Sequence, residues 1–271
     1  NGIPLVFYTV SGNYKYSLTA PLSKFFNLRK KQITLFSDQK AALKIAKSTM
    51  VYKITNQLAV IERLRRRKGG GVTQTETDLK NMMEPINNAS DAEELLGLEG
   101  SAARKYWQEI DRYITPDFPF EKRSKRPPGN EANALISFVY SLLYSVVCGL
   151  VQGHAYEPFL GFFHKVKNGR YTLALDLMEP YRPIVDRFSL AILNKSIVND
   201  QDFFSKDKGV FLNEKGRKKV ITQFYQFIQA DRAFLNLKDK YSVIKGIRMT
   251  IESLKGQIMG NEDIFYPLLK G

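Results

Sequence analysis

The feature that most constrains the fold is an uncharged, largely apolar run of 18 residues from Ala134 to Val151. A run of this length is at the short end of what an α-helix needs to cross a bilayer. Serines at 137, 141 and 145 and tyrosines at 140 and 144 interrupt it, which is polar for a helix facing lipid. We therefore predict a helix buried in the core of a large soluble domain.

Helical periodicity continues through most of the chain. Apolar and small residues recur at three- and four-residue steps from Ala41 to Leu58, as on a helix with one buried face. Arg63 to Lys68 form a basic run, and the glycines at 69–71 end this helix. These glycines lack the Gly-Lys-Ser/Thr of a phosphate-binding P-loop. Further helical patterns cover 75–87, 89–96, 100–113, 130–151, 175–195, 213–229 and 235–259.

The first residues follow a different pattern. Ile3 to Val10 is β-branched and aromatic, 11–13 is a predicted turn, and Tyr14 to Thr19 alternates like a partner strand. Because two strands are unstable alone, we expect them to end a small β-domain that begins before this chain. The predicted fold is mainly α: the end of a truncated β-domain at 1–23, a linker at 24–37, and a multi-helical domain at 38–271.

The net charge and the amino-acid composition limit the possible partners and metal sites of the protein. The chain has 41 Lys and Arg against 27 Asp and Glu, and this net charge of +14 favours a polyanionic partner, with nucleic acid ahead of an acidic membrane. A single cysteine, Cys148, excludes an internal disulfide and a thiolate zinc site. Two histidines, His154 and His164, cannot form a three-histidine centre. We expect a cytosolic protein.

Three places in the sequence hold residues that could take part in catalysis or bind a metal ion. Glu99 is a lone acid between glycines in an apolar stretch, His164 follows an aromatic run, and Asp176 and Glu179 are three apart in apolar surroundings. On a helix, the last two share a face and repel unless a cation neutralises them. Ordinary structural roles, a helix-start carboxylate and a core histidine, remain the alternatives. Together these residues offer oxygen and nitrogen ligands suited to Mg²⁺ or Mn²⁺.

Several segments resemble CRISPR-associated protein 1, the integrase subunit of spacer acquisition. They are Lys53–Gln57, Gly97–Trp107, Arg123–Leu135, Phe159–His164, Leu173–Pro183 and Gly209–Arg217, all in the family's order. The resemblance implies an N-terminal β-domain, a linker and a helical catalytic domain. It also implies that Glu99, His164 and Glu179 bind Mg²⁺ or Mn²⁺, with Asp176 as a direct or an indirect ligand.

The implied reaction is transesterification, in which a 3′-hydroxyl of captured DNA attacks a phosphodiester at a CRISPR repeat; with water as the attacker the site is an endonuclease. The implied partners are double-stranded DNA, a dimer of CRISPR-associated protein 2 and a second copy of this chain; some relatives are fused to a reverse transcriptase. A stand-alone nuclease and a non-catalytic nucleic-acid scaffold remain as alternatives. The implied location is the prokaryotic cytoplasm, without a membrane.

Two basic clusters are the candidates for DNA binding. One comprises Arg63, Arg65 and Arg66, and the other comprises Lys122, Arg123, Lys125 and Arg126, which have no apolar interleaving and should be exposed. Lys215, Arg217, Lys218 and Lys219 are weaker candidates. Contacts of this kind bind phosphates without reading bases.

Overall fold

The computed structural model describes residues 5–9, 14–18 and 26–271. Its elements in chain order are β1 (Leu5–Tyr8), β2 (Tyr14–Leu18), α1 (Phe26–Ser37), α2 (Gln39–Lys68), α3 (Gln74–Asn81), α4 (Met83–Asn88), α5 (Ala92–Asp111), α6 (Glu131–Gly153), α7 (Thr172–Met178), η2 (Glu179–Tyr181), α8 (Arg182–Asn194), η3 (Asp200–Asp202), β3 (Phe203–Lys206), β4 (Gly209–Leu212), α9 (Glu214–Gln229), β5 (Arg232–Ala233), β6 (Lys240–Tyr241) and α10 (Val243–Met259). The mainly α prediction is confirmed.

The long helix α2 is bounded as its sequence predicts. Asp38 caps its first turn by accepting hydrogen bonds from the backbone N–H groups of Lys40 and Ala41. Gly69 ends it in the left-handed conformation, with φ of 72°, which a residue without a Cβ adopts at little cost. The buried face of α2 packs against α5, α8 and η2.

Helix α5 differs from the prediction of separate helices at 89–96 and 100–113. It runs unbroken from Ala92 to Asp111 through Gly97 and Gly100, after an N-cap at Asp91. Glycine lowers helix propensity by about 1 kcal/mol, and tertiary packing overrides that preference here. Glu99 therefore lies inside a helix, two turns after its start, and is not a helix-start carboxylate.

Helix α6 is the predicted core helix. It is long and apolar enough to span a membrane, but 61% of its most apolar window is buried inside the protein. It packs against α7, α8, α9 and α10. Its burial within the helical assembly fits a core helix and gives no support to a membrane span.

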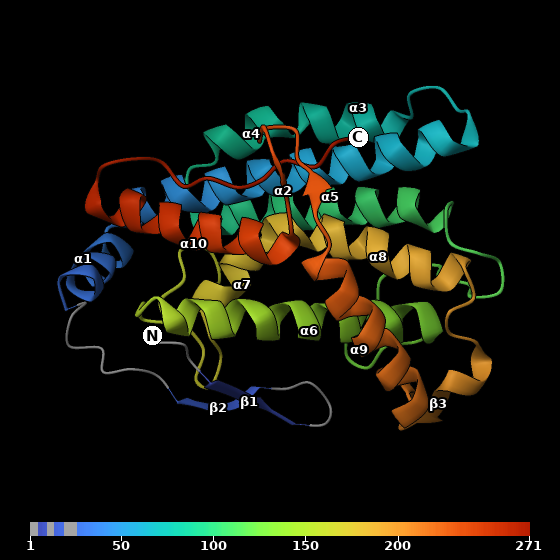
Figure 1. Cartoon of the computed structure of the whole chain (residues 1–271). Coiled ribbons are helices and arrows are strands. Elements are labelled where there is room, and N and C mark those ends of the chain that lie inside the picture. The colour runs from blue at the N-terminus through green and yellow to red at the C-terminus, as the bar shows by residue number, and fades with distance from the viewer. Residues whose placement is uncertain (1–4, 10–13, 19–25) are drawn as a thin grey trace.

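The segment α7–η2–α8 lies between α2 above and α6 below (Figure 1). Every residue of α7 and η2 is buried. Asn56 of α2 fixes this layer, because its side chain donates to the carbonyls of Pro180 and Pro267 and accepts from the N–H of Leu269. Tyr181 of η2 also hydrogen bonds to Thr250 of α10 at 2.6 Å, so α10 and the C-terminal segment cover one side of this layer.

The N-terminal hairpin matches its prediction where it is described. β1 and β2 pair antiparallel, with Leu5 opposite Leu18, and lie below α6 in Figure 1. The predicted turn at 11–13 is outside the described residues. The segment predicted as a linker contains α1, whose Gln32 is buried and donates to the carbonyls of Glu157 and Leu160. The domain boundaries themselves stay a prediction.

Candidate functional site

Three of the four residues singled out for chemistry line one pocket of about 150 Å³, called here the central pocket. Glu99 from α5, His164 from the α6–α7 loop and Glu179 from η2 line it directly. Asp176 lies immediately behind His164, within 2.6 Å. Residues separated by up to 80 positions in the sequence are therefore assembled into one site.

Asp176 organises the loop that carries His164. Its Oδ2 accepts the backbone N–H groups of Phe162 and Phe163 at 2.5 and 2.9 Å, and its Oδ1 accepts that of His164 at 3.1 Å. Gly161 permits this approach, since a Cβ there would stand 2.5 Å from Asp176 Oδ2. The backbone thus surrounds a buried carboxylate that would be costly to bury without these bonds.

The same carboxylate fixes the tautomer of His164. Nδ1 of His164 donates to Oδ1 of Asp176 at 2.6 Å. In the neutral imidazole the lone pair is then on Nε2, which faces the central pocket 3.9 Å from Oε1 of Glu179. A carboxylate behind an imidazole is the usual way in which proteins orient a metal-binding histidine. Because both oxygens of Asp176 already accept hydrogen bonds, the geometry favours a positioning role for it over direct ligation.

Glu179 is a buried carboxylate held by cations. Its Oε1 accepts from Nε of Arg182 at 2.8 Å, and its Oε2 lies 2.7 Å from Nζ of Lys53. Burial alone would raise the pKa of Glu179, but the charges of Arg182 and Lys53 hold that pKa well below its usual value. Oε2 is buried and receives no hydrogen bond of good geometry, only the ion pair.

Lys53 joins the two glutamates. Its Nζ is 2.5 Å from Oε1 of Glu99 as well as 2.7 Å from Glu179, and its side chain is only 8% exposed. Burial by itself lowers the pKa of Lys53, but the two carboxylates outweigh this effect and raise it above its usual value. The ammonium is therefore charged and stands between the predicted ligands.

The donor set fits a hard divalent cation. Two carboxylates, one imidazole with a free Nε2 and an unsatisfied carboxylate oxygen are what Mg²⁺ or Mn²⁺ binds. Within the described part of the chain, no three His, Cys, Asp or Glu side chains are yet grouped closely enough to enclose an ion. The ammonium of Lys53 lies between the two glutamates, and the chemistry and charge of the donor set fit a divalent ion.

A second hollow of about 580 Å³ adjoins the central pocket and is called here the basic groove. It shares Lys125, Tyr140, Arg170 and Arg182 with that pocket. Its six cationic lining residues, with no acid among the lining residues, are Arg123, Lys125, Arg126, Lys167, Arg170 and Arg182. Serine and tyrosine side chains of α6 line another part of it, and the remaining lining residues are Asn168, Gly169, Leu175 and Met178. The groove therefore suits a polyanion.

The predicted exposure of the 122–126 cluster holds for Lys122, Lys125 and Arg126 and is wrong for Arg123. The guanidinium of Arg123 donates to Asn133 and Ser137, each at 2.9 Å, and lies over the rings of Trp107 and Tyr140. Burial lowers the pKa of Arg123, with Tyr140 and Asp186 opposing that effect. Arg123 thus anchors the loop to α5 and α6, as well as lining the groove.

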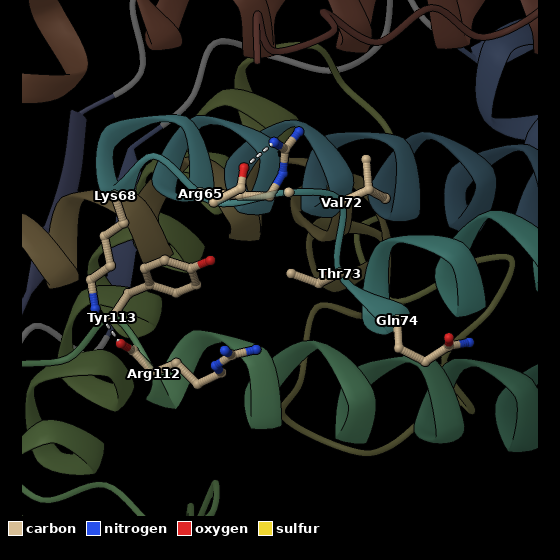
Figure 2. A pocket seen from close by; sticks show the side chains of 9 residues that line it. Arg65, Lys68, Val72, Thr73, Gln74, Arg112 and Tyr113 are labelled. Carbon is tan, nitrogen blue, oxygen red and sulfur yellow. Dashed lines mark hydrogen bonds between the residues drawn. The ribbon is translucent and has the colours of Figure 1, made fainter.

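The 63–66 cluster also contains both an exposed arginine and one that is paired within the protein. Arg65 is turned inward: its Nε pairs with the buried carboxylate of Glu76 at 3.0 Å, and its Nη1 donates to the carbonyl of Gly70 at 2.9 Å. Figure 2 shows it in a pocket at the α2–α3 turn, beside Lys68 and Tyr113. Arg66 is exposed and pairs with Glu62 one turn earlier. Arg65 therefore stabilises the turn, a role that the charge run alone does not reveal.

The weaker basic candidates near residue 217 are mostly engaged within the protein. Lys219 pairs with the buried Asp202 at 2.6 Å, and Arg217 donates to the carbonyl of Leu212. Lys218 is exposed and pairs with Glu214. Lys215 is exposed. This cluster holds the start of α9 against η3 and β4.

Sequence patterns did not mark Lys53, Arg170, Tyr140 and Arg182 as site residues. A signal was present for Lys53, which is three residues after Met50 and seven after Ala46 and so lies on the buried stripe of α2. A lysine is almost never fully buried unless it is paired with an acid, so that position alone predicts carboxylate partners. No comparable signal marks Tyr140, which resembles any other core aromatic.

The chain is similar to proteins of one known family. The model of the family described as CRISPR associated protein Cas1 matches residues 1–226. The CRISPR-associated endonuclease Cas1 of Leptospira interrogans is 31% identical over 250 residues, covering 85% of this chain and 96% of that protein.

Two solved structures have the same fold. A Cas1 protein from Thermotoga maritima is 27% identical, with a TM-score of 0.78 over 97% of this chain and 80% of that one. A chain of a partial Cas6-RT-Cas1–Cas2 complex is 25% identical, with a TM-score of 0.82 over 98% of this chain and 81% of that one.

Proposed function

Because the chain belongs to the Cas1 family of CRISPR-associated proteins, we propose that it is a divalent-metal-dependent DNA integrase of CRISPR spacer acquisition. The observation that carries the proposal is the arrangement of Glu99, His164 and Glu179 around a pocket that opens into a groove lined by cations. The groove supplies the site for a phosphodiester, and the pocket supplies the groups that act on it.

The reaction is a transesterification. The 3′-oxygen of a captured DNA end forms a bond to the phosphorus at the 5′ edge of a repeat strand, and the bond from that phosphorus to the 3′-oxygen of the adjoining nucleotide breaks, which leaves a new 3′-end. The attacking hydroxyl releases its proton to solvent, and the departing oxygen takes one up. Since one phosphodiester replaces another, no external energy source is needed.

Glu99, His164 and Glu179 would hold Mg²⁺ or Mn²⁺. A bound ion supplies Lewis-acid polarisation of the phosphoryl oxygen. Asp176 keeps the lone pair of His164 on Nε2, facing the pocket. Arg182 fixes one oxygen of Glu179 and lines the groove, where its charge can also stabilise a phosphate.

The basic groove would hold the DNA backbone. Its cations neutralise phosphates and release counterions, so affinity should fall with salt at a logarithmic slope of about 0.9 per neutralised phosphate. Replacing Arg126 and Lys167 by Gln should weaken binding and reduce that slope. Removing the same two charges at Arg248 and Lys255, which are exposed residues of α10, is the matched control, and an identical loss there would contradict the assignment of the groove.

Hydrolysis by the same site is a second candidate, favoured by the endonuclease name of the Leptospira relative. Water would then replace the 3′-hydroxyl as the attacking group. The partial complex that shares this fold is named for Cas6, RT and Cas2 as well as Cas1. We propose Cas2, double-stranded DNA and a second copy of this chain as partners, and the prokaryotic cytoplasm as the location.

Strand transfer tests the function directly. Purified protein with Cas2 and Mn²⁺ or Mg²⁺ is mixed with a labelled short duplex and a supercoiled plasmid that carries a CRISPR repeat. Label joined covalently to plasmid, and lost both in EDTA and with His164→Ala, is the expected result. Nicked plasmid without joined label would favour hydrolysis, and normal joining by Glu99→Ala would refute the assigned site.

A further inference from the structure

The ammonium of Lys53 occupies the space between the two glutamates. It is 2.5 Å from Oε1 of Glu99 and 2.7 Å from Oε2 of Glu179. Lys53 and Glu179 are buried, with side chains 8% and 5% exposed. Two carboxylates this close repel each other strongly when nothing neutralises them. Lys53 is the only cation within ion-pair distance of Glu99 among the described residues, and it bridges Glu99 to Glu179.

The oxygen atoms available on Glu179 are limited. Oε1 accepts the hydrogen bond from Nε of Arg182 at 2.8 Å. Oε2 faces Lys53 and accepts no hydrogen bond of good geometry, although it is buried. The carboxylate oxygen of Glu179 that accepts no hydrogen bond is thus the one in contact with the ammonium of Lys53. A divalent ion held by Glu99 and Glu179 would lie in the space that this ammonium fills.

An ammonium and a divalent cation cannot share that place. Their charges repel, and a divalent ion held by Glu99 and Glu179 would compete with the ammonium for these carboxylates. A lysine side chain has a flexible four-carbon stem, so its charged end can move while its backbone stays in α2. The central pocket, about 150 Å³ in volume, adjoins it and gives the ammonium room to move.

We propose that Lys53 is a resident counter-cation, which holds Glu99 and Glu179 together in the metal-free protein and is displaced when the divalent ion binds. It is a positioning residue that sets metal affinity: it keeps the ligands assembled and competes with the ion for them. The inference rests on the proposed function, because it takes Glu99, His164 and Glu179 as the metal ligands.

The test is Mn²⁺ binding, measured by electron paramagnetic resonance of free Mn²⁺ and by calorimetry. Lys53→Met keeps the apolar stem and removes the charge, and should bind Mn²⁺ at least tenfold more tightly than wild type. Lys53→Arg keeps the charge and should bind no more tightly than wild type. Lys44→Met is the matched control, since Lys44 is also on α2 and pairs with an acid, Asp263, but is exposed. Its affinity should not change.

Thermal unfolding in EDTA gives a second readout. Lys53→Met should unfold at a lower temperature than wild type, because two carboxylates are left facing each other. Saturating Mn²⁺ should raise its unfolding temperature more than that of wild type. Adding Glu99→Gln to Lys53→Met removes the repulsion and should restore stability in EDTA. If Lys53→Met does not fold in EDTA, recovery by Mn²⁺ or by Glu99→Gln supports the proposal, and failure of both refutes it.

The outcomes separate this inference from the proposed function. Mn²⁺ binding that is lost in His164→Ala but equal or weaker in Lys53→Met would refute the role of Lys53 and leave the metal site intact. Binding of Mn²⁺ by neither wild type nor Lys53→Met at millimolar concentration would overturn both. Binding that is detectable only in Lys53→Met would support both.

Discussion

Asp186 allows a quantitative test of the network beside the central pocket. Its carboxyl is 2% exposed and accepts hydrogen bonds from Tyr140 at 2.7 Å and Tyr106 at 3.1 Å. Burial raises the pKa of Asp186 from 3.8 to about 6, although both tyrosines and the charges of Arg123 and Arg182 oppose the rise. Because Tyr140 lines both the central pocket and the basic groove, this carboxyl supports the wall between them.

The direction of the pH effect follows from the raised pKa. Between about pH 4 and pH 6 the native protein retains a proton on Asp186 that the unfolded chain has lost, so stability falls as pH rises through this interval. One pKa unit corresponds to about 1.4 kcal/mol, which gives a loss of about 3 kcal/mol. Asp186→Asn cannot ionise. Its stability relative to wild type should therefore grow by about 3 kcal/mol between pH 4 and pH 7.

Urea unfolding of both proteins at several pH values between 4 and 7.5 measures this difference. Comparing the two at each pH cancels the titration of all other groups. Asp200→Asn, at an exposed position, is the control and should show no such widening. A constant difference between Asp186→Asn and wild type across this range would refute the reasoning, because Asp186 would then ionise equally easily in both states.

Three further predictions concern the loop of His164 and the basic segment. Asp176→Asn should weaken Mn²⁺ binding 10- to 100-fold, since it removes the acceptor that fixes the imidazole; calorimetry measures this. Gly161→Ala places a Cβ 2.5 Å from Oδ2 of Asp176 and should lower both the unfolding temperature and Mn²⁺ affinity; an unchanged unfolding temperature would contradict the close approach. Arg123→Gln should lower the free energy of unfolding by about 1–3 kcal/mol, whereas Lys122→Gln should change it by less than about 0.5 kcal/mol in urea titrations; equal effects would contradict the buried contacts of Arg123.

Apolar periodicity, with the glycine stop at 69–71, was enough to predict most helices. The apolar stripe of α2, its Asp38 cap and its Gly69 end are local signals, and the structure follows them. The α5 region was predicted wrongly because glycine is a weak local signal that packing overrides. The single helix predicted at 235–259 begins only at Val243, after the short pair β5–β6. In that segment Phe234 bridges to Leu269, a distant pairing that local propensity does not contain.

The residues able to do chemistry could be identified from local patterns. An acid, a histidine and a spaced acid pair in apolar surroundings can be recognised in the sequence without knowledge of the fold. How these residues act together depends on long-range contacts, because α2, α5, the α6–α7 loop and η2 bring them to one pocket. The same contacts place Lys53 between the glutamates and turn Arg65 and Arg123 inward, since burial and pairing arise between segments that are distant in the chain.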